Sequence, residues 1–592
     1  MAAELDLRIA GGVIVDGTGS PGRRADVGVK SGRVVALGRD AETAATRVID
    51  ADGQVVAPGF VDVHTHYDAQ LFWDQTLSPS ALHGVTTVIA GNCGLTLAPV
   101  APEHEDFLTR LLARVEAIPV NAIQSGVPFR WRSFGEFLDV VSSRPTAVNL
   151  GFLTGHSALR RAAMGRRASE STASRSELAR MQAMLGDALR AGSLGFSSST
   201  SPTQVDGDGS PSPPNFAAPD ELIALAAVCA EQPGTSLEFV PSSFLQGFTQ
   251  EHLDLMGDMS AAANRHLNWN SVLINEQKPE IHERQVGSAD AARERGGCVV
   301  PMVIPHNFRT RTDFLESDVG FRLVPGWEWL FGLAAGDRVK ALADTSARAK
   351  LAASFQSATT PMAESLREGL GDYVVSDCDG PAASLVGRCV RDVAHSRGSD
   401  ELSTVFDLAV ETELGVGFVR YMFSNSTPGT HELRSRVLRD HRVMLGASDG
   451  GAHLRSVVNV EYPTMCFEEL VRALHVFTVE ELVHELADKP ARLYGLVGRG
   501  RLVVGGAGDV VVFDPASIAP TPVRMVADLP GGARRLFTGG VGISTVIVNG
   551  QVVAEDGRYT GVLPGRLLRS GVDTRTVTVG DAWAVMDGDR GR

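Results

Sequence analysis

The chain has 592 residues, of which 43% are hydrophobic and 21% charged, and this length predicts more than one structural unit. It contains no run of 18 apolar residues, which excludes a membrane-spanning helix. A formal net charge of −15 disfavours nucleic acids and anionic membranes as partners, because both attract basic surfaces. A small-molecule substrate is therefore the simpler expectation. Six cysteines without CxxC spacing and a start without a basic leader predict a cytoplasmic protein.

The two ends of the chain share one pattern, and the middle has another. Residues 1–58 are short runs of alternating apolar and polar residues separated by Gly and Asp, typical of strands joined by tight turns. Residues 59–496 alternate short apolar strands with helical stretches, which predicts an α/β fold with a TIM-like (β/α)8 barrel. Strands return in residues 497–592, ahead of a C-terminal tail. Because these strands repeat the opening pattern, we expect both ends to pair into one small β domain.

Two segments do not follow the alternation of strands and helices. Residues 201–217 are rich in Pro, Gly, Ser and Asp, which predicts a long surface loop over one mouth of the barrel. Residues 309–372 are rich in helix-forming residues, which predicts a helical insertion within the barrel that could cover the site as a lid.

The segment PGFVDVHTHYD at residues 58–68 is the strongest chemical signal. An apolar strand ends in His64 and His66, and alternation along a strand points both imidazoles to one side, at the C-terminal mouth of the barrel. Two neutral imidazoles on one face form half of a metal site. Taken alone, the pattern fits two structural histidines equally well.

Two further strand ends carry residues that bind metals. GVTTVIAGNCG places Cys93 after an apolar strand, where a thiolate can hold a divalent ion, although a lone cysteine is more often a small buried apolar residue. MLGASDGGAH places Asp449 after a late strand, where a carboxylate can bind metal and remove a proton from an attacking water; a plain Asp-Gly turn is the alternative.

At these residues the chain resembles the amidohydrolase superfamily, and within it the N-acyl-D-amino acid deacylase (D-aminoacylase) branch. The resemblance covers nearly the whole length and rests on VVAPGFVDVHTHYDAQLFWD, GVTTVIAGNCGLTLAPV, GHSALRRAAMG, ASDGGAH and the ending KPARLYGLVGRGRLVVGGAGDVVVFDP. It implies a barrel with a composite β-sandwich. It also implies one or two zinc ions held by His64, His66, Cys93 and Asp449, with Cys93 in place of the usual carboxylated lysine.

The chain departs from this branch at the middle strands. The branch supplies two further histidines there, but the comparable segments read TSLEFVPSS and LNWNSVLIN. Glu238, Asn268 or Asn270 stands in those places, so Glu238 is a candidate additional ligand and Asn270 a candidate substrate contact. Where the branch carries a substrate-contacting tyrosine, the chain has MVIPH, which makes His306 a candidate contact. D-amino acid specificity does not follow from these residues.

Two other histidines are candidates for substrate binding. His156, in TGHSALR, follows an apolar strand, and a structural hydrogen-bonding role is an equal alternative. His453 follows Asp449 by four residues and either orients that carboxylate or substrate or is an ordinary loop histidine.

The pattern predicts hydrolysis of a carbon–nitrogen amide bond in a small molecule, with an N-acyl amino acid as the first candidate substrate. Zinc would lower the pKa of a bound water toward about 7, and Asp449 would act as the general base and then the general acid. The alternatives are a cyclic-amide hydrolase, which uses lysine where this chain has Cys93, and a non-catalytic binding protein. The surface is compatible with a homo-oligomer. Neither GxGxxG, GxxxxGK[ST] nor GxSxG occurs in the required context, which argues against phosphate binding and a serine nucleophile.

Overall fold

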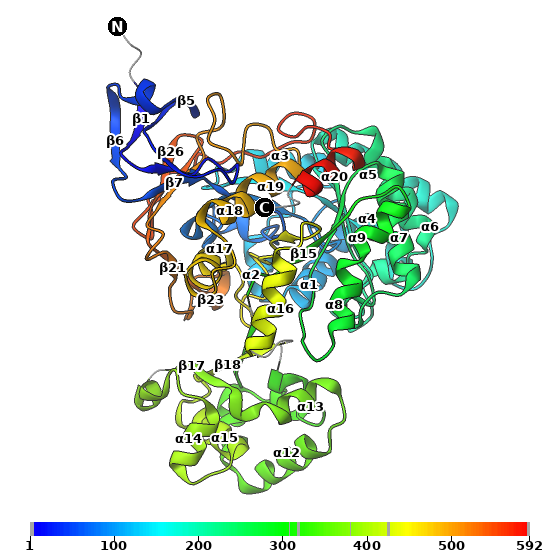
Figure 1. The fold of residues 1–592 in the computed structure, drawn as a ribbon. Helices are drawn as coiled ribbons and strands as arrows, with labels where there is room; N and C mark the ends of the chain where they lie inside the picture. Colours follow the sequence, from blue (N-terminus) through cyan, green and yellow to red (C-terminus); the bar gives the residue numbers. More distant parts are fainter. Residues whose placement is uncertain (1–4, 307, 316–319, 379, 423–426, 589–592) are drawn as a thin grey trace.

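The computed structural model describes residues 5–306, 308–315, 320–378, 380–422 and 427–588 (Figure 1). Its centre is a closed ring of parallel strands, each hydrogen-bonded to the next. In chain order these strands are β8 (Phe60–Asp62), β9 (Val85–Ala90), β10 (Asn149–Phe152) with its continuation β11 (Thr154–Gly155), β12 (Gly195–Ser199), β13 (Ser236–Val240), β14 (Leu267–Trp269), β15 (Val299–Val303) and β19 (Met444–Leu445). A parallel bridge between Thr65 and Gly450 closes the ring from β19 back to β8. The expected barrel is therefore confirmed.

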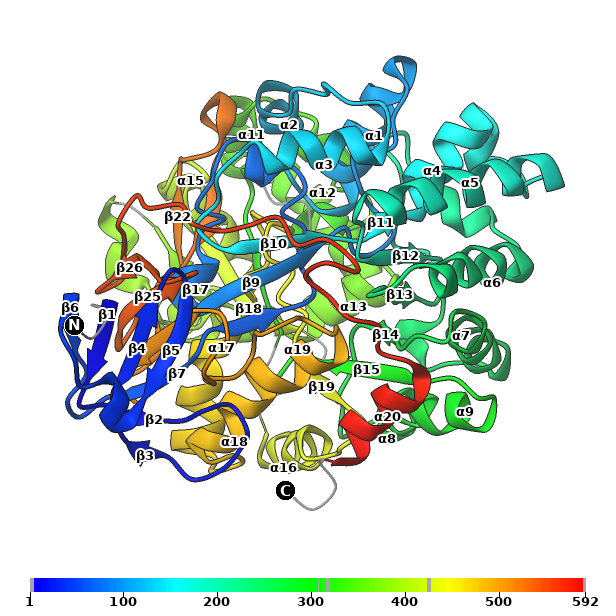
Figure 2. The same cartoon turned by 90° about the horizontal axis from the view of Figure 1, so that it is seen from above.

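Helices cover the outside of this ring because their apolar faces pack on the strands. Figure 2 shows α5, α6, α7 and α9 along the outer face of β12 to β15. The helices of this layer and its loops are α1 (Glu105–Val115), α2 (Val120–Gly126), α3 (Phe134–Ser142), α4 (His156–Met164), α5 (Arg175–Ala191), α6 (Pro219–Val228), α7 (Gln250–Ala263), α8 (Pro279–Val286), α9 (Ser288–Glu294), α16 (Pro428–Leu438), α17 (Tyr462–Cys466), α18 (Val479–Val483), α19 (Lys489–Leu493) and α20 (Val579–Gly588). No helix among these described residues is long and apolar enough to cross a membrane.

The β domain unites the two ends of the chain, as expected. Strand β7 from the N-terminal segment pairs with β20 from the C-terminal segment in one sheet. A second sheet consists only of strands from the N-terminal segment. The first sheet contains β2 (Val13–Ile14), β3 (Arg23–Arg24), β7 (Val55–Pro58), β20 (Val510–Phe513), β25 (Ile543–Val548), β26 (Gln551–Glu555) and β27 (Arg558–Tyr559); the second contains β1 (Leu5–Ala10), β4 (Val27–Lys30), β5 (Arg33–Leu37) and β6 (Ala45–Asp50). Apolar side chains of both sheets share one core, which includes Ile9, Val27, Val510 and Ile547.

Two short strand pairs extend this C-terminal region. Strand β21 (Ala519–Pro520) pairs with β24 (Gly540–Val541), and β22 (Arg524–Val526) pairs with β23 (Arg535–Phe537). The second pair reaches the barrel, because the Leu536 amide donates to the carbonyl of Leu454 in the loop after β19.

A separate unit is inserted between β15 and β19, and it projects from one end of the barrel (Figure 1). It contains β16 (Phe308–Thr312), α10 (Glu328–Phe331), α11 (Ala335–Ala343), α12 (Thr345–Ser357), α13 (Pro361–Glu368), β17 (Val374–Asp377), α14 (Val390–Arg397), α15 (Glu401–Glu411) and β18 (Gly417–Met422). Aromatic side chains such as Phe314, Phe321 and Trp327 form its own core. The unit continues past residue 372, the end that the sequence pattern predicts, because β18 returns to pair with β16 only at residue 417.

Candidate metal centre and substrate pocket

The C-terminal ends of β8, β9 and β19 place four candidate metal-binding side chains at one mouth of the barrel. His64 and His66 follow β8, Cys93 follows β9 and Asp449 follows β19. Backbone hydrogen bonds hold the first and last of these segments together: the Asp449 amide donates to the His64 carbonyl at 3.2 Å, and the His66 amide donates to the Gly450 carbonyl at 2.7 Å. The barrel closure therefore also assembles the site.

The four side chains converge. Cys93 Sγ lies 3.6 Å from His64 Nε2, and Asp449 Oδ1 lies 3.3 Å from His64 Nε2 and 3.7 Å from His66 Nε2. Ligand atoms of His64, His66 and Cys93 all lie within 4.8 Å of one another. Two imidazoles, a thiol and a carboxylate form a donor set that suits zinc in particular.

The backbone at this site adopts conformations that non-glycine residues rarely take. Cys93, Ala447 and Asp449 have φ values of 56°, 64° and 52°. Such left-handed residues persist only where the surrounding structure holds them, and they concentrate at functional sites. Gly451 shows how tight the packing is, since a Cβ there would lie 2.6 Å from the His66 carbonyl oxygen.

Buried charges shift the pKa values of these groups strongly. Burial acts to raise the pKa of Asp449, but His64 and His66 outweigh it and hold that pKa well below its usual range. Burial lowers the pKa of His64. It acts in the same direction on His66, yet Glu116 and Asp449 raise the pKa of His66 to about 9. The carboxylate of Asp449 is thus ionised, and a metal ion would compete with a proton at His66.

Cys93 is a buried thiol whose pKa lies well above its usual range. Burial is the main cause, and the carboxylates of Glu238, Glu116 and Asp449 add to it. A thiolate at this position therefore requires a nearby cation, as in a metal site.

Glu238, on β13, lies directly behind Cys93. Its Oε2 accepts a hydrogen bond from the Cys93 amide at 2.9 Å, and burial raises its pKa to about 8. The other oxygen, Oε1, is buried without a hydrogen-bond partner in the part of the chain that the structure describes. An unsatisfied oxygen next to the donor set is a further feature that a bound cation would satisfy.

Glu116 belongs to this site but gives no signal in the sequence. It follows α1 rather than a barrel strand, and its Oε1 lies 3.5 Å from His66 Nδ1, on the side of the ring away from Asp449. The His453 amide donates to its backbone carbonyl at 2.5 Å. A carboxylate behind a metal-binding imidazole fixes the tautomer and orientation of the ring.

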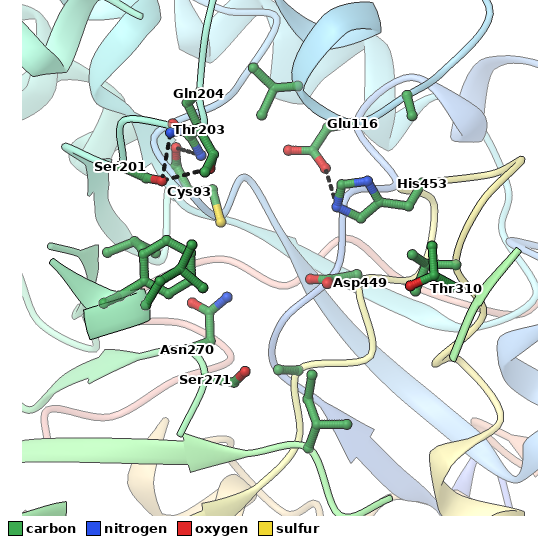
Figure 3. Close-up of a pocket in the computed structure, with 18 of the residues that line it drawn as sticks. Cys93, Glu116, Ser201, Thr203, Gln204, Asn270, Ser271, Thr310, Asp449 and His453 are labelled. Carbon is green, nitrogen blue, oxygen red and sulfur yellow. Dashed lines mark hydrogen bonds and ion pairs between the residues drawn. The ribbon is translucent and has the colours of Figure 1, made fainter. Parts of the chain in front are cut away.

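A cavity of about 480 Å³ is lined by three of the candidate metal ligands, His66, Cys93 and Asp449. Figure 3 shows Cys93, Asn270 and Asp449 around its centre, with Glu116 and His453 beside each other beyond Asp449. Asn270 Nδ2 lies 3.2 Å from His64 Nε2. His306 and His453 also line the cavity, as does Ser201 from the 201–217 loop. Thr310 and Leu323 of the inserted unit complete one wall.

His156 and Asn268 lie apart from both this cavity and the candidate metal ligands. His156 is fully buried, with Nδ1 2.9 Å from Ser198 Oγ and Nε2 2.9 Å from Glu221 Oε1, so the structure assigns it to internal hydrogen bonding rather than to substrate. Asn268 accepts a hydrogen bond from the Tyr494 hydroxyl at 2.5 Å, deeper in the barrel than Asn270. Residues 268 and 270 share one face of the strand, but Asn270 follows the last residue of β14 and therefore lies nearer the mouth of the barrel.

Comparison with known proteins shows that the fold is shared with characterised deacylases. The chain is 28% identical to the D-aminoacylase of Alcaligenes xylosoxydans xylosoxydans over 565 residues, covering 95% of this chain and 97% of that protein. It is 27% identical to the N-acyl-D-aspartate deacylase of the same organism, covering 96% of each. The crystal structure of N-acyl-D-glutamate deacylase from Bordetella bronchiseptica, complexed with zinc and a phosphonate inhibitor, superimposes with a TM-score of 0.62 at 25% identity, over 96% of this chain and 100% of that one.

These similarities extend through the β domain as well as the barrel, as expected from the sequence. The sequence model of the protein family described as "Amidohydrolase family" matches residues 47–554. This range includes every barrel strand and the strands that join the two ends of the chain. Since the match takes in most of the chain and both of these units, the protein belongs to the amidohydrolase family.

Proposed function

We propose that this protein hydrolyses the amide bond of an N-acyl amino acid in a zinc-dependent reaction. The observation that carries the proposal is the convergence of Asp449 with His64, His66 and Cys93, three of which, His66, Cys93 and Asp449, line a cavity. The relatives support the same chemistry, because those named above are a D-aminoacylase and deacylases of N-acyl-D-amino acids. We therefore expect the D enantiomer to be the substrate.

The side chains fit a zinc ion through His64 Nε2, His66 Nε2, Cys93 Sγ and Asp449 Oδ1, and Glu238 Oε1 offers a further oxygen for that ion or a second one. When bound, zinc supplies Lewis acidity toward water and toward the scissile carbonyl. The number of ions bound per chain, compared between Glu238→Gln and the unmodified protein, tests the contribution of Glu238.

Asp449 performs the proton transfers in this mechanism. Its side chain is 18% exposed and faces the cavity, so water reaches it there. The carboxylate removes a proton from the attacking water as the carbon–oxygen bond forms, and it then donates that proton to the leaving nitrogen as the carbon–nitrogen bond breaks. The products are a carboxylate and a free amine. Protonation of nitrogen is needed because an amide anion is a poor leaving group.

Glu116→Gln tests the role of the carboxylate behind His66. We expect zinc affinity to fall by roughly 10- to 100-fold, because the glutamine lacks the charge that stabilises the proton on His66 Nδ1. Competition with a chelator measures the affinity. Glu103→Gln is the control, since Glu103 is exposed ahead of α1. Unchanged zinc affinity in the Glu116 variant would show that this carboxylate does not support the metal centre.

The proposed function is tested by elemental analysis combined with an acyl-release assay. We expect at least one zinc per chain and hydrolysis of N-acetyl-D-amino acids in preference to their L enantiomers. A preparation that holds no zinc after zinc addition and releases no acetate from either series would refute the proposal. Preference for the L series would refute the stereochemical part alone.

A further inference from the structure

Asn270 is a neutral amide side chain that lies among the candidate metal ligands. It directly follows β14 at the mouth of the barrel and lines the cavity with His66, Cys93 and Asp449. Figure 3 shows its amide directed toward the space between Cys93 and Asp449. The nitrogen Nδ2 lies 3.2 Å from His64 Nε2, and the side chain also hydrogen-bonds Cys93. Asn270 thus contacts two candidate ligands without carrying a charge.

The carboxamide of Asn270 has hydrogen-bonding capacity that the protein does not use. Its oxygen Oδ1 is buried and has no hydrogen-bond partner among the residues that the structure describes. Its nitrogen carries two N–H donors, and the nearby His64 Nε2 is the ring nitrogen that faces Cys93 Sγ and Asp449 Oδ1. A metal ion bound to that imidazole would use the same lone pair. The amide would then lack an acceptor, and a buried donor without an acceptor favours the binding of a new one.

The other asparagine of this strand differs in exactly this respect. Asn268 has both polar atoms of its side chain engaged: Oδ1 accepts from the Tyr494 hydroxyl at 2.5 Å, and Nδ2 lies 3.2 Å from Met302 Sδ. Asn268 is therefore satisfied inside the barrel, whereas the amide of Asn270 is presented to the cavity. The contrast favours a ligand, rather than the protein interior, as the partner of Asn270.

The chemistry of a carboxamide limits what that ligand is. An amide is a poorer ligand for zinc than imidazole or thiolate, but its N–H groups donate hydrogen bonds to a negatively charged oxygen. Hydrolysis of an amide produces such an oxygen, because the carbonyl oxygen becomes negatively charged when water adds to the carbonyl carbon. Donors that are already in place stabilise this charge most effectively. The acidic residues that line the cavity, Glu116 and Asp449, would instead repel it.

We propose that Asn270 is a catalytic residue whose side-chain N–H donates a hydrogen bond to the carbonyl oxygen of the scissile amide as that oxygen becomes negatively charged. This inference rests on the hydrolysis proposed above and adds a residue to it. No proton leaves Asn270, since the proton transfers belong to Asp449. The hydrogen bond is strongest in the tetrahedral intermediate and weakens when the carbon–nitrogen bond breaks and the carbonyl forms again. Its contribution therefore belongs to kcat rather than to KM.

Two other roles of Asn270 lead to different results. A metal ligand would contribute to zinc affinity, and a packing residue would affect the binding of every ligand to the same extent. The experiment therefore measures zinc affinity and the binding of an analogue of the intermediate in addition to turnover.

The first measurement compares turnover of N-acetyl-D-leucine by the unmodified protein and by Asn270→Ala, both at saturating zinc. We expect kcat to fall by roughly 10²- to 10³-fold with little change in KM, which is the usual cost of removing one donor to such an oxygen. Zinc affinity, measured by competition with a chelator, should stay within about threefold of its original value, because no metal donor is removed.

The second measurement is the binding of N-methylphosphonyl-D-leucine, whose tetrahedral, negatively charged phosphorus group imitates the intermediate. By calorimetry we expect its affinity for Asn270→Ala to be at least about 30-fold weaker than for the unmodified protein, because the analogue carries the charge that the amide stabilises. The affinity for the product D-leucine should not change. This comparison does not depend on turnover.

A second variant and a matched control complete the experiment. Asn270→Asp keeps the shape of the side chain and replaces the N–H donor by a carboxylate oxygen, which covers the case of an alanine variant that fails to fold. It should be at least as slow as Asn270→Ala, because like charges repel. Asn275→Ala is the control and should keep its kcat. Asn275 lies in the loop after β14, does not line the cavity, and accepts a hydrogen bond from the Gln277 amide.

The outcomes distinguish the possible roles. Turnover of both Asn270 variants within about tenfold of the unmodified protein would overturn the proposal and leave amide hydrolysis intact. A loss of zinc affinity that parallels the loss of turnover would make Asn270 a metal ligand, and equal losses of affinity for the analogue and for D-leucine would make it a packing residue. Either result would also overturn the proposal. Absence of hydrolysis by the unmodified, zinc-loaded protein would overturn both the inference and the function on which it rests.

Discussion

Replacement of Asp449 by Asn is expected to lower kcat by roughly 10²- to 10⁴-fold, because asparagine keeps the shape of the side chain but cannot accept the proton of the attacking water. Asp449 sits between both imidazoles, 3.3 Å from His64 Nε2 and 3.7 Å from His66 Nε2. These contacts hold the pKa of its carboxyl below the usual range, so the unmodified protein carries the ionised base over the whole neutral range.

The measurement separates catalysis from metal binding by assaying Asp449→Asn at saturating zinc and determining its zinc content in parallel. Circular dichroism and thermal melting establish that the fold is retained. Asp440→Asn serves as a control, because Asp440 precedes the same strand and pairs with Arg442 away from the cavity. Turnover of Asp449→Asn within tenfold of the unmodified protein would exclude Asp449 as the proton-transfer group.

Cys93→Ala is expected to remove zinc or to weaken its binding by at least about 100-fold, because it deletes one of the closely grouped donors and leaves two imidazoles and a carboxylate. The measurement is zinc content by elemental analysis after dialysis, followed by titration with zinc. Activity should recover only at zinc concentrations far above those that saturate the unmodified protein.

The chain provides a matched control for this substitution. Cys229 is also a fully buried free cysteine, and burial raises its pKa to about 12, but it lies at the end of α6, outside the cavity. Cys229→Ala should lose some stability and keep its zinc. If Cys93→Ala and Cys229→Ala behave alike, with full zinc content in both, Cys93 is an apolar core residue.

Much of this architecture could be predicted from the positions at which the apolar strands end. In a parallel barrel all strands end at the same mouth, so residues that follow apolar runs are expected to meet there even when they are far apart in the chain. His64, Cys93 and Asp449 meet for this reason, although 385 positions separate the first from the last. The pairing of β7 with β20 was predictable in the same way, from the matching patterns of the two ends.

The barrel, the composite β domain and the convergence of the strand-end donors could be predicted, because hydrophobic periodicity and the alternation of strands with helices can be read along the chain. Only the tertiary structure placed Glu116 behind His66, since Glu116 follows a helix and reaches the site through a loop contact with His453. It also turned His156 inward to Glu221 and brought Asn270, rather than Asn268, to the metal-binding side chains. Such placements depend on how helices and loops pack on the barrel, and no local pattern of residues encodes that packing.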